Sequence, residues 1–206
     1  MADANLRTHK KPSQEGEIKI VDQSVNNIQA DIVTVQRGAT GDIQARIVTV
    51  SQAGARNIEA ETVELRQAGA QVVKGNTINV RQGGVVQARA EQLSMVQGGI
   101  VFAETKEVNL TASTAGAILA GGNTVLDQSA VRVVLSRGNV SMDQSGSGLI
   151  VARHITTGSN TGTIFMLAGR VDGEVNSVFG PAAGAAFGAA FALVISLIFW
   201  LKKRLF

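Results

Sequence analysis

The sequence predicts an all-β protein whose main part is a parallel β-solenoid of about 10–11 turns, followed by one C-terminal transmembrane α-helix. Three observations lead to this fold class. Similar residues recur at a fixed interval of 15 or 16, which is the signature of a repeat architecture. Apolar residues within each repeat lie two apart, which is the period of a strand. A stretch of 23 uncharged residues follows the last repeat.

Composition limits the possible functions. The chain has 206 residues and no cysteine, which excludes a disulfide framework and any thiolate site. The net charge of +3 equals the charge of Lys202, Lys203 and Arg204, and the other 16 basic residues are balanced by 16 acidic ones. The main body is therefore neutral by count, and no nucleic-acid partner is expected.

The first segment, residues 1–16, is polar and charged, contains Pro12 and has no apolar period. We expect a flexible polar arm here. The segment lacks the apolar core of a secretory signal peptide.

Residues 17–176 are expected to form the solenoid. One apolar column has a step of 15 residues and comprises Ile18, Val33, Val48, Val63, Ile78, Leu93 and Val108. A second column lies two residues further on, from Ile20 to Leu110, and another ladder lies five residues earlier, beginning at Ile28 and Ala30. The step then lengthens to 16 twice, through Thr124 and Val140, and returns to 15 at Ile155. Fifteen residues are too few for a strand and a return helix, so each repeat is expected to be one turn of a coil of short strands.

Two polar or small-residue columns are expected to mark corners of this coil. Four glycines at the 15-residue step are assigned to corners that need positive φ or a close backbone approach, namely Gly54, Gly69, Gly84 and Gly99. Four glutamines two residues earlier are candidates for a stacked amide ladder, namely Gln52, Gln67, Gln82 and Gln97. The alternative is that these glutamines are ordinary solvated corner residues.

No arrangement of residues in the sequence predicts chemistry. The two histidines, His9 and His154, have no carboxylate or second histidine at a metal-ligand spacing. The densest acidic group, Glu59, Glu61 and Glu64, alternates with apolar residues as solvent-facing strand positions do. We therefore expect no enzymatic activity, no cofactor, no metal and no small-molecule substrate.

The C-terminal segment, residues 177–206, is expected to be a membrane helix with a basic tail. The uncharged stretch from Phe179 to Leu201 would be ~34 Å long as a helix, enough to cross a hydrocarbon core of ~30 Å. The residues that would anchor it at the interface are Trp200, Lys202, Lys203 and Arg204. The alternative is a buried helix of a non-membrane protein.

One face of this segment carries small residues four apart, which allow two helices to approach closely. They are Gly180, Gly184, Gly188 and Ala192. The stripe predicts self-association, and the alternative is an alanine- and glycine-rich span that packs against nothing. The lack of an N-terminal signal favours tail anchoring with the solenoid in the cytoplasm, whereas the terminal basic residues favour the opposite orientation.

The repeats "IVTVSQAG" and "TVELRQAG", together with a polar arm and a membrane attachment, give a chain that resembles the bactofilins. The resemblance covers about residues 17–175 and is one of architecture and repeat style. It implies a bacterial cytoskeletal protein whose solenoids polymerise end to end without nucleotide, often at the membrane.

The expected function is a non-enzymatic, membrane-anchored structural scaffold whose partners are the lipid bilayer and further copies of itself. One alternative is an oligomeric membrane assembly or pore, in which the small-residue helices cluster beneath a rigid collar of solenoids. Another is a surface module that binds polysaccharide or ice.

Overall fold

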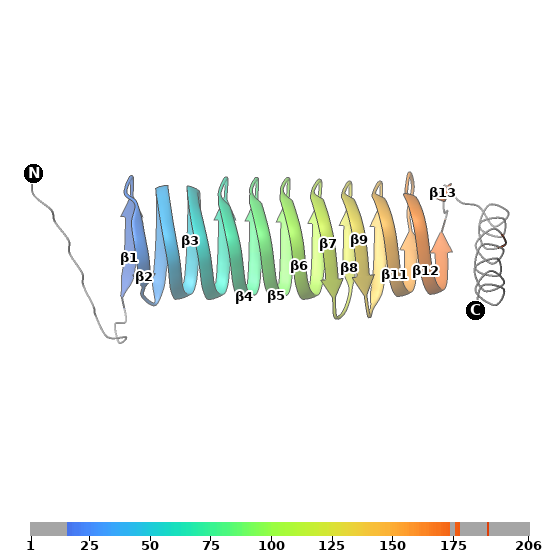
Figure 1. Ribbon diagram of the computed structural model, residues 1–206, viewed down its shortest axis with the longest axis horizontal. Coiled ribbons are helices and arrows are strands. Elements are labelled where there is room, and N and C mark those ends of the chain that lie inside the picture. Colours follow the sequence, from blue (N-terminus) through green and yellow to red (C-terminus); the bar gives the residue numbers. More distant parts are fainter. Residues whose placement is uncertain (1–15, 174–175, 178–188, 190–206) are drawn as a thin grey trace, which may run out of the picture.

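The computed structural model describes residues 16–173, 176–177 and 189, and within them the chain coils into a rod of about ten turns (Figure 1). All pairings between its strands are parallel. The predicted all-β parallel solenoid is therefore confirmed. Its strands are β1 (Glu17–Val21), β2 (Val25–Gln29), β3 (Ile32–Arg66), β4 (Gly69–Arg81), β5 (Gly84–Val96), β6 (Gly99–Thr111), β7 (Thr114–Ala120), β8 (Thr124–Asp127), β9 (Ala130–Ser136), β10 (Asn139–Asp143), β11 (Gly146–Thr157), β12 (Gly162–Gly173) and β13 (Asn176–Ser177).

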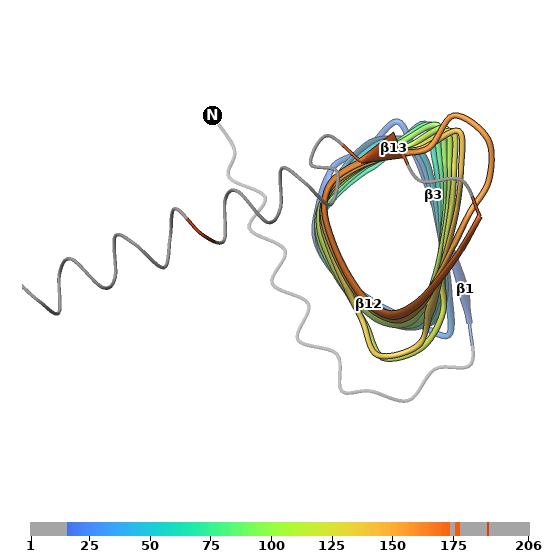
Figure 2. The same cartoon turned by 90° about the vertical axis from the view of Figure 1, so that its right-hand side faces the viewer.

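Each turn stacks on the next in the predicted register. Val63 pairs with Ile78, a step of 15, whereas Val108 pairs with Thr124, a step of 16. The step is again 16 from Thr124 to Val140, 15 from Val140 to Ile155 and 16 from Ile155 to Val171. In the view along the rod the turns superimpose into a closed outline, and yellow and orange loops project from it among the later turns, where the longer repeats occur (Figure 2).

The core lies inside this closed outline and consists of the predicted columns. Val33, Val63 and Ile78 of the first column are fully buried, with 0% of their surface exposed. The ladder five residues earlier also points inward, as Ile58 and Val73 show. Alternation of inward and outward side chains explains why β-branched residues are favoured here, since they pack well on a pleated surface.

A third set of inward positions was not predicted. Its residues vary in size and polarity, so the sequence shows no uniform column, although all of them are buried: Thr40, Ala55, Ala70, Val85, Ile100, Ala115 and Val131. Side chains from three parts of each turn thus meet in the interior.

Stacking, and not the single turn, buries these side chains. Burying one Val, Leu or Ile side chain contributes about 1.5–3 kcal/mol, and in a solenoid each turn is covered only by its neighbours. The end turns show the consequence: Ile18 is 38% exposed and Val171 is 40% exposed, although their column is almost completely buried elsewhere.

The outer segments of the predicted domain plan fall largely outside the described residues. These segments are the arm at 1–16 and the membrane segment at 177–206, of which only Gly16, Ser177 and Ala189 are described. Both assignments remain predictions.

Candidate functional site

Each turn has one corner at which a residue other than glycine adopts a left-handed backbone conformation. The residues have φ between 46° and 56°, and they are Asp22, Arg37, Gln52, Gln67, Gln82, Gln97, Ala112, Gln128, Gln144 and Asn160. Left-handed conformations are uncommon for such residues because Cβ approaches the following carbonyl oxygen. Six of the ten are glutamine.

The prediction that Gly54, Gly69, Gly84 and Gly99 occupy these strained positions is wrong. None of the four has positive φ, and a Cβ added to Gly54 or Gly99 would meet no atom within 4 Å. They lie two residues beyond the left-handed glutamines, and three of them begin strands β4, β5 and β6. In these four turns the left-handed backbone conformation is therefore adopted by glutamine and not by glycine.

The glutamine side chains at the corners are hydrogen-bonded from turn to turn. The Nε2 group of Gln52 donates to Oε1 of Gln67 at 3.2 Å, Gln67 donates to Gln82 at 3.1 Å, and Gln82 donates to Gln97 at 3.2 Å. Each internal member of this amide ladder both donates and accepts. In these four turns the ladder offsets part of the cost of the left-handed backbone, at a position where glycine or asparagine would be expected.

A second ladder, which the sequence analysis missed, supports the corners of later turns. It consists of Ser113, Ser129 and Ser145, each 4% exposed or less. The Ser113 amide donates to Oγ of Ser129 at 3.2 Å, and the Ser129 amide donates to Oγ of Ser145 at 3.0 Å. Each hydroxyl in turn donates to the carbonyl two residues earlier in its own turn at 2.7 Å. The 16-residue spacing of these serines is the feature from which the sequence could have predicted this ladder.

Ion pairs also connect neighbouring turns in the first half of the rod. Arg37 contacts Asp22 at 2.8 Å, and Arg46 contacts Asp31 at the same distance. The hydrogen bonds from these guanidinium groups hold the pKa values of Asp22 and Asp31 below their ordinary range. Arg89 pairs with Glu104 in the same way, at 2.9 Å. Opposite charges on neighbouring turns favour the observed register, because a slip would separate the paired groups.

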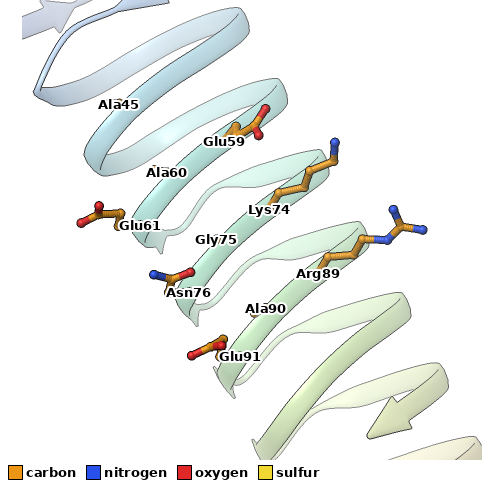
Figure 3. A pocket seen from close by; sticks show the side chains of 10 residues that line it. All are labelled: Ala45, Glu59, Ala60, Glu61, Lys74, Gly75, Asn76, Arg89, Ala90 and Glu91. Atoms are coloured by element: carbon orange, nitrogen blue, oxygen red, sulfur yellow. The ribbon is translucent and has the colours of Figure 1, made fainter. Parts of the chain in front are cut away.

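A shallow groove runs beside these charges, with a hollow of about 550 Å³ (Figure 3). Its floor consists of small residues of successive turns, Ala45, Ala60, Gly75 and Ala90. Glu59, Lys74 and Arg89 line one side and Glu61, Asn76 and Glu91 line the other (Figure 3). The first side combines one carboxylate with two cations, whereas the second has two carboxylates and an amide, so this part of the groove does not present charge of one sign to a ligand.

The same columns form a second hollow of about 560 Å³ further along the rod. On one side of this hollow Glu104 is followed by Leu119, Leu135 and Val151, at positions that are charged in the earlier turns. The other side includes Arg137. This part of the surface therefore combines exposed apolar side chains with a positive charge.

His154 lies beside a carboxylate that is distant in the sequence and was not predicted as its neighbour. Its Nε2 atom lies 2.9 Å from Oδ2 of Asp172 in the next turn, and Arg170 contacts the same carboxylate at 3.1 Å. Asp172 lies 18 residues after His154 in the sequence, and the stacking of turns brings the two together. Among the described residues, no group of three or more histidine, cysteine, aspartate or glutamate side chains could hold a metal ion.

The predicted membrane residues cannot be placed. The helix-packing residues Gly180, Gly184, Gly188 and Ala192 and the anchor residues Trp200, Lys202, Lys203 and Arg204 all lie outside the described part of the chain. Within the part that is described, no helix is long and apolar enough to cross a bilayer.

Comparisons with known proteins add no further assignment: no family model, curated protein or solved structure matches the chain. The functional interpretation therefore depends on the surface and the two ends of the rod.

Proposed function

We propose that the chain is a structural scaffold protein that associates end to end through its solenoid and is anchored to a membrane by residues 179–201. The assembly would be similar to a bactofilin polymer. The anchor rests on the sequence alone, through the uncharged stretch and the basic residues that follow it.

The observation that supports end-to-end association is the exposure of core residues at both ends. Ile18 and Val171 belong to a column that is 0–3% exposed from Val33 to Ile155, yet they are 38% and 40% exposed. Among the described residues, β1 pairs only with β3, which leaves its outer edge without a strand partner. Such an edge is a template for pairing with another chain.

A head-to-tail joint would continue the ladder across the boundary between two copies. It would place Ile18 of one copy on Val171 of the next, in the same core column. Ile28, which is 6% exposed, would lie near Met166 of the neighbouring copy, since both belong to one inward ladder. A contact between two different ends of the same molecule does not close on itself and therefore produces a filament.

The test is Ile18→Asp, compared with Val96→Asp as a matched control. Both wild-type side chains are 38% exposed, but Ile18 lies at the end of the rod and Val96 on its side. Burying an unpaired carboxylate at a joint costs about 3 kcal/mol or more, which corresponds to at least ~100-fold weaker association.

Electron microscopy and sedimentation of the purified full-length chain would distinguish the outcomes. We expect filaments for the wild type and for Val96→Asp, and single rods for Ile18→Asp. Filaments that persist in both variants would refute the end-to-end joint. Closed rings of the wild type would instead favour the membrane assembly with a collar.

A further inference from the structure

Two outward-facing columns change from polar to apolar along the rod. In β7, β9, β11 and β12 they present, in register, Ala117, Val133, Leu149 and Phe165 in one column and Leu119, Leu135, Val151 and Leu167 in the other. We call these eight residues the apolar face. Leu119, Leu135 and Leu167 are 37%, 38% and 66% exposed.

In the earlier turns the same two columns are mostly polar. The column of Leu135 begins with Gln29 and Gln44 and continues through Glu59, Lys74, Arg89 and Glu104, all outward-facing. A strand with one buried face normally alternates apolar and polar side chains. In these two columns the later strands instead present apolar side chains outward, and such a contiguous exposed patch marks an interaction site.

Within the turns that form the apolar face most nearby charges are positive, and Glu104, which adjoins Leu119 at the edge of the face, is paired with Arg89. The segments 112–123, 128–139, 144–154 and 160–170 contain no aspartate or glutamate. Arg132, Arg137 and Arg153 are exposed, and none forms an ion pair with another described residue. The acidic residues Asp127 and Asp143 of this half lie on different strands, β8 and β10, and Asp172 at the end of β12 is paired with Arg170.

We propose that the apolar face rests on an anionic lipid bilayer. Apolar side chains bordered by arginine are the combination that binds at the interface of a membrane with negatively charged headgroups. An anionic bilayer offers negative headgroups to Arg132, Arg137 and Arg153 wherever they lie along the face, whereas a protein partner with a mixed-charge surface would need acidic groups at three matching positions.

The position of the face in the chain also supports a lipid partner. β12 contributes Phe165 and Leu167 and is followed, after β13, by the uncharged stretch 179–201. The apolar face could bind lipid without that stretch. Only the attachment of the face and the stretch to the same bilayer rests on the proposed anchor. The last turns of the rod would then lie on the membrane while the charged first turns extend along or away from it.

The absence of cysteine from the chain allows a direct test with single labels. Leu135→Cys and Lys74→Cys form a matched pair, because both positions belong to the same outward column. The full-length chain, carrying an environment-sensitive dye at one position, is reconstituted with vesicles of phosphatidylglycerol or of phosphatidylcholine. Quenchers carried by the lipid and iodide in the water report where each dye lies.

We expect the dye at position 135 to be quenched by lipid and shielded from iodide in phosphatidylglycerol vesicles, and the dye at position 74 to be open to iodide in both. The combined variant Arg132→Gln, Arg137→Gln and Arg153→Gln should abolish the lipid quenching at 135. Arg56→Gln is the control, since Arg56 is exposed in the charged half, and it should leave the quenching unchanged.

Equal iodide access at positions 135 and 74 would overturn the inference. Shielding from iodide at position 135 without lipid quenching would also overturn the inference. Shielding that depends on protein concentration would assign the face to a second copy, and shielding that does not would assign it to another segment of the same chain. Vesicle flotation reports the anchor separately. A chain that floats with both lipids while position 135 stays in water refutes the lipid-contact face alone. A chain that floats only with phosphatidylglycerol and is shielded at 135 refutes the anchor alone.

Discussion

The buried serine ladder provides a sharp test of how the later corners are held. Replacing Ser129 with alanine removes a hydroxyl that accepts from the Ser113 amide at 3.2 Å and donates to the Asp127 carbonyl at 2.7 Å. The amide of Ser129 keeps its own acceptor, the hydroxyl of Ser145. The substitution therefore leaves one specific amide without a partner.

The size of the effect follows from burial. Ser129 is 3% exposed, so the Ser113 amide would lose its acceptor in the interior, at a cost of about 1–3 kcal/mol. Ser141→Ala is the matched control because Ser141 lies outward on the neighbouring strand β10. We expect that control to change stability by less than about 0.5 kcal/mol.

Amide hydrogen exchange measures this prediction residue by residue. In Ser129→Ala the Ser113 amide should exchange about 10- to 100-fold faster, which corresponds to the expected loss of free energy. The Gly98 amide, which donates to the Ser113 hydroxyl at 3.2 Å, should keep most of its protection. An unchanged exchange rate at Ser113 would refute the assignment of the ladder as a support of these corners.

Substitutions at two further positions test the corner and the core. Gln82→Ala keeps the left-handed backbone, with φ of 54°, but loses both amide hydrogen bonds, so it should destabilise the protein by about 1 kcal/mol. Gln82→Gly also loses these bonds but relieves the backbone strain, so it should melt close to the wild type. Equal melting temperatures of the two variants would contradict the left-handed corner. Thr124 is fully buried in an aliphatic column, and its hydroxyl has no hydrogen-bond partner among the described residues. Thr124→Val should therefore raise the stability by about 1 kcal/mol, measured by thermal unfolding. A loss of stability would show that the hydroxyl is satisfied.

The sequence was sufficient to predict the solenoid because the period of inward positions is imposed by stacking. Val63 and Ile78 must lie over one another, so their spacing records the length of a turn. The corner was misassigned because glycine is the usual residue at positive φ, whereas here Gln67 holds that geometry through a bond to the next turn.

The apolar face was missed for a different physical reason. Columns of similar residues mark positions at which the fold constrains the residue type. The column of Leu135 faces outward, so the fold does not constrain its residue types. The change from Lys74 and Arg89 to Leu119 and Leu135 along this column is what indicates the apolar face. That change becomes visible only once the register has shown that these residues are neighbours.

The change in surface has a consequence for assembly. The core is equally buried in both halves, as Val63 and Ile150 show, so the scaffold tolerates two different surfaces because each turn contacts only its neighbours. In a head-to-tail filament the apolar face would recur once per subunit, at a spacing of ~50 Å for about ten turns. A filament with alternating head-to-head and tail-to-tail joints would pair these faces at the tail-to-tail joints and double the repeat to ~100 Å. The spacing of membrane contacts along a filament would therefore report the polarity of the joint, which links the proposed end-to-end assembly to the proposed lipid-contact face.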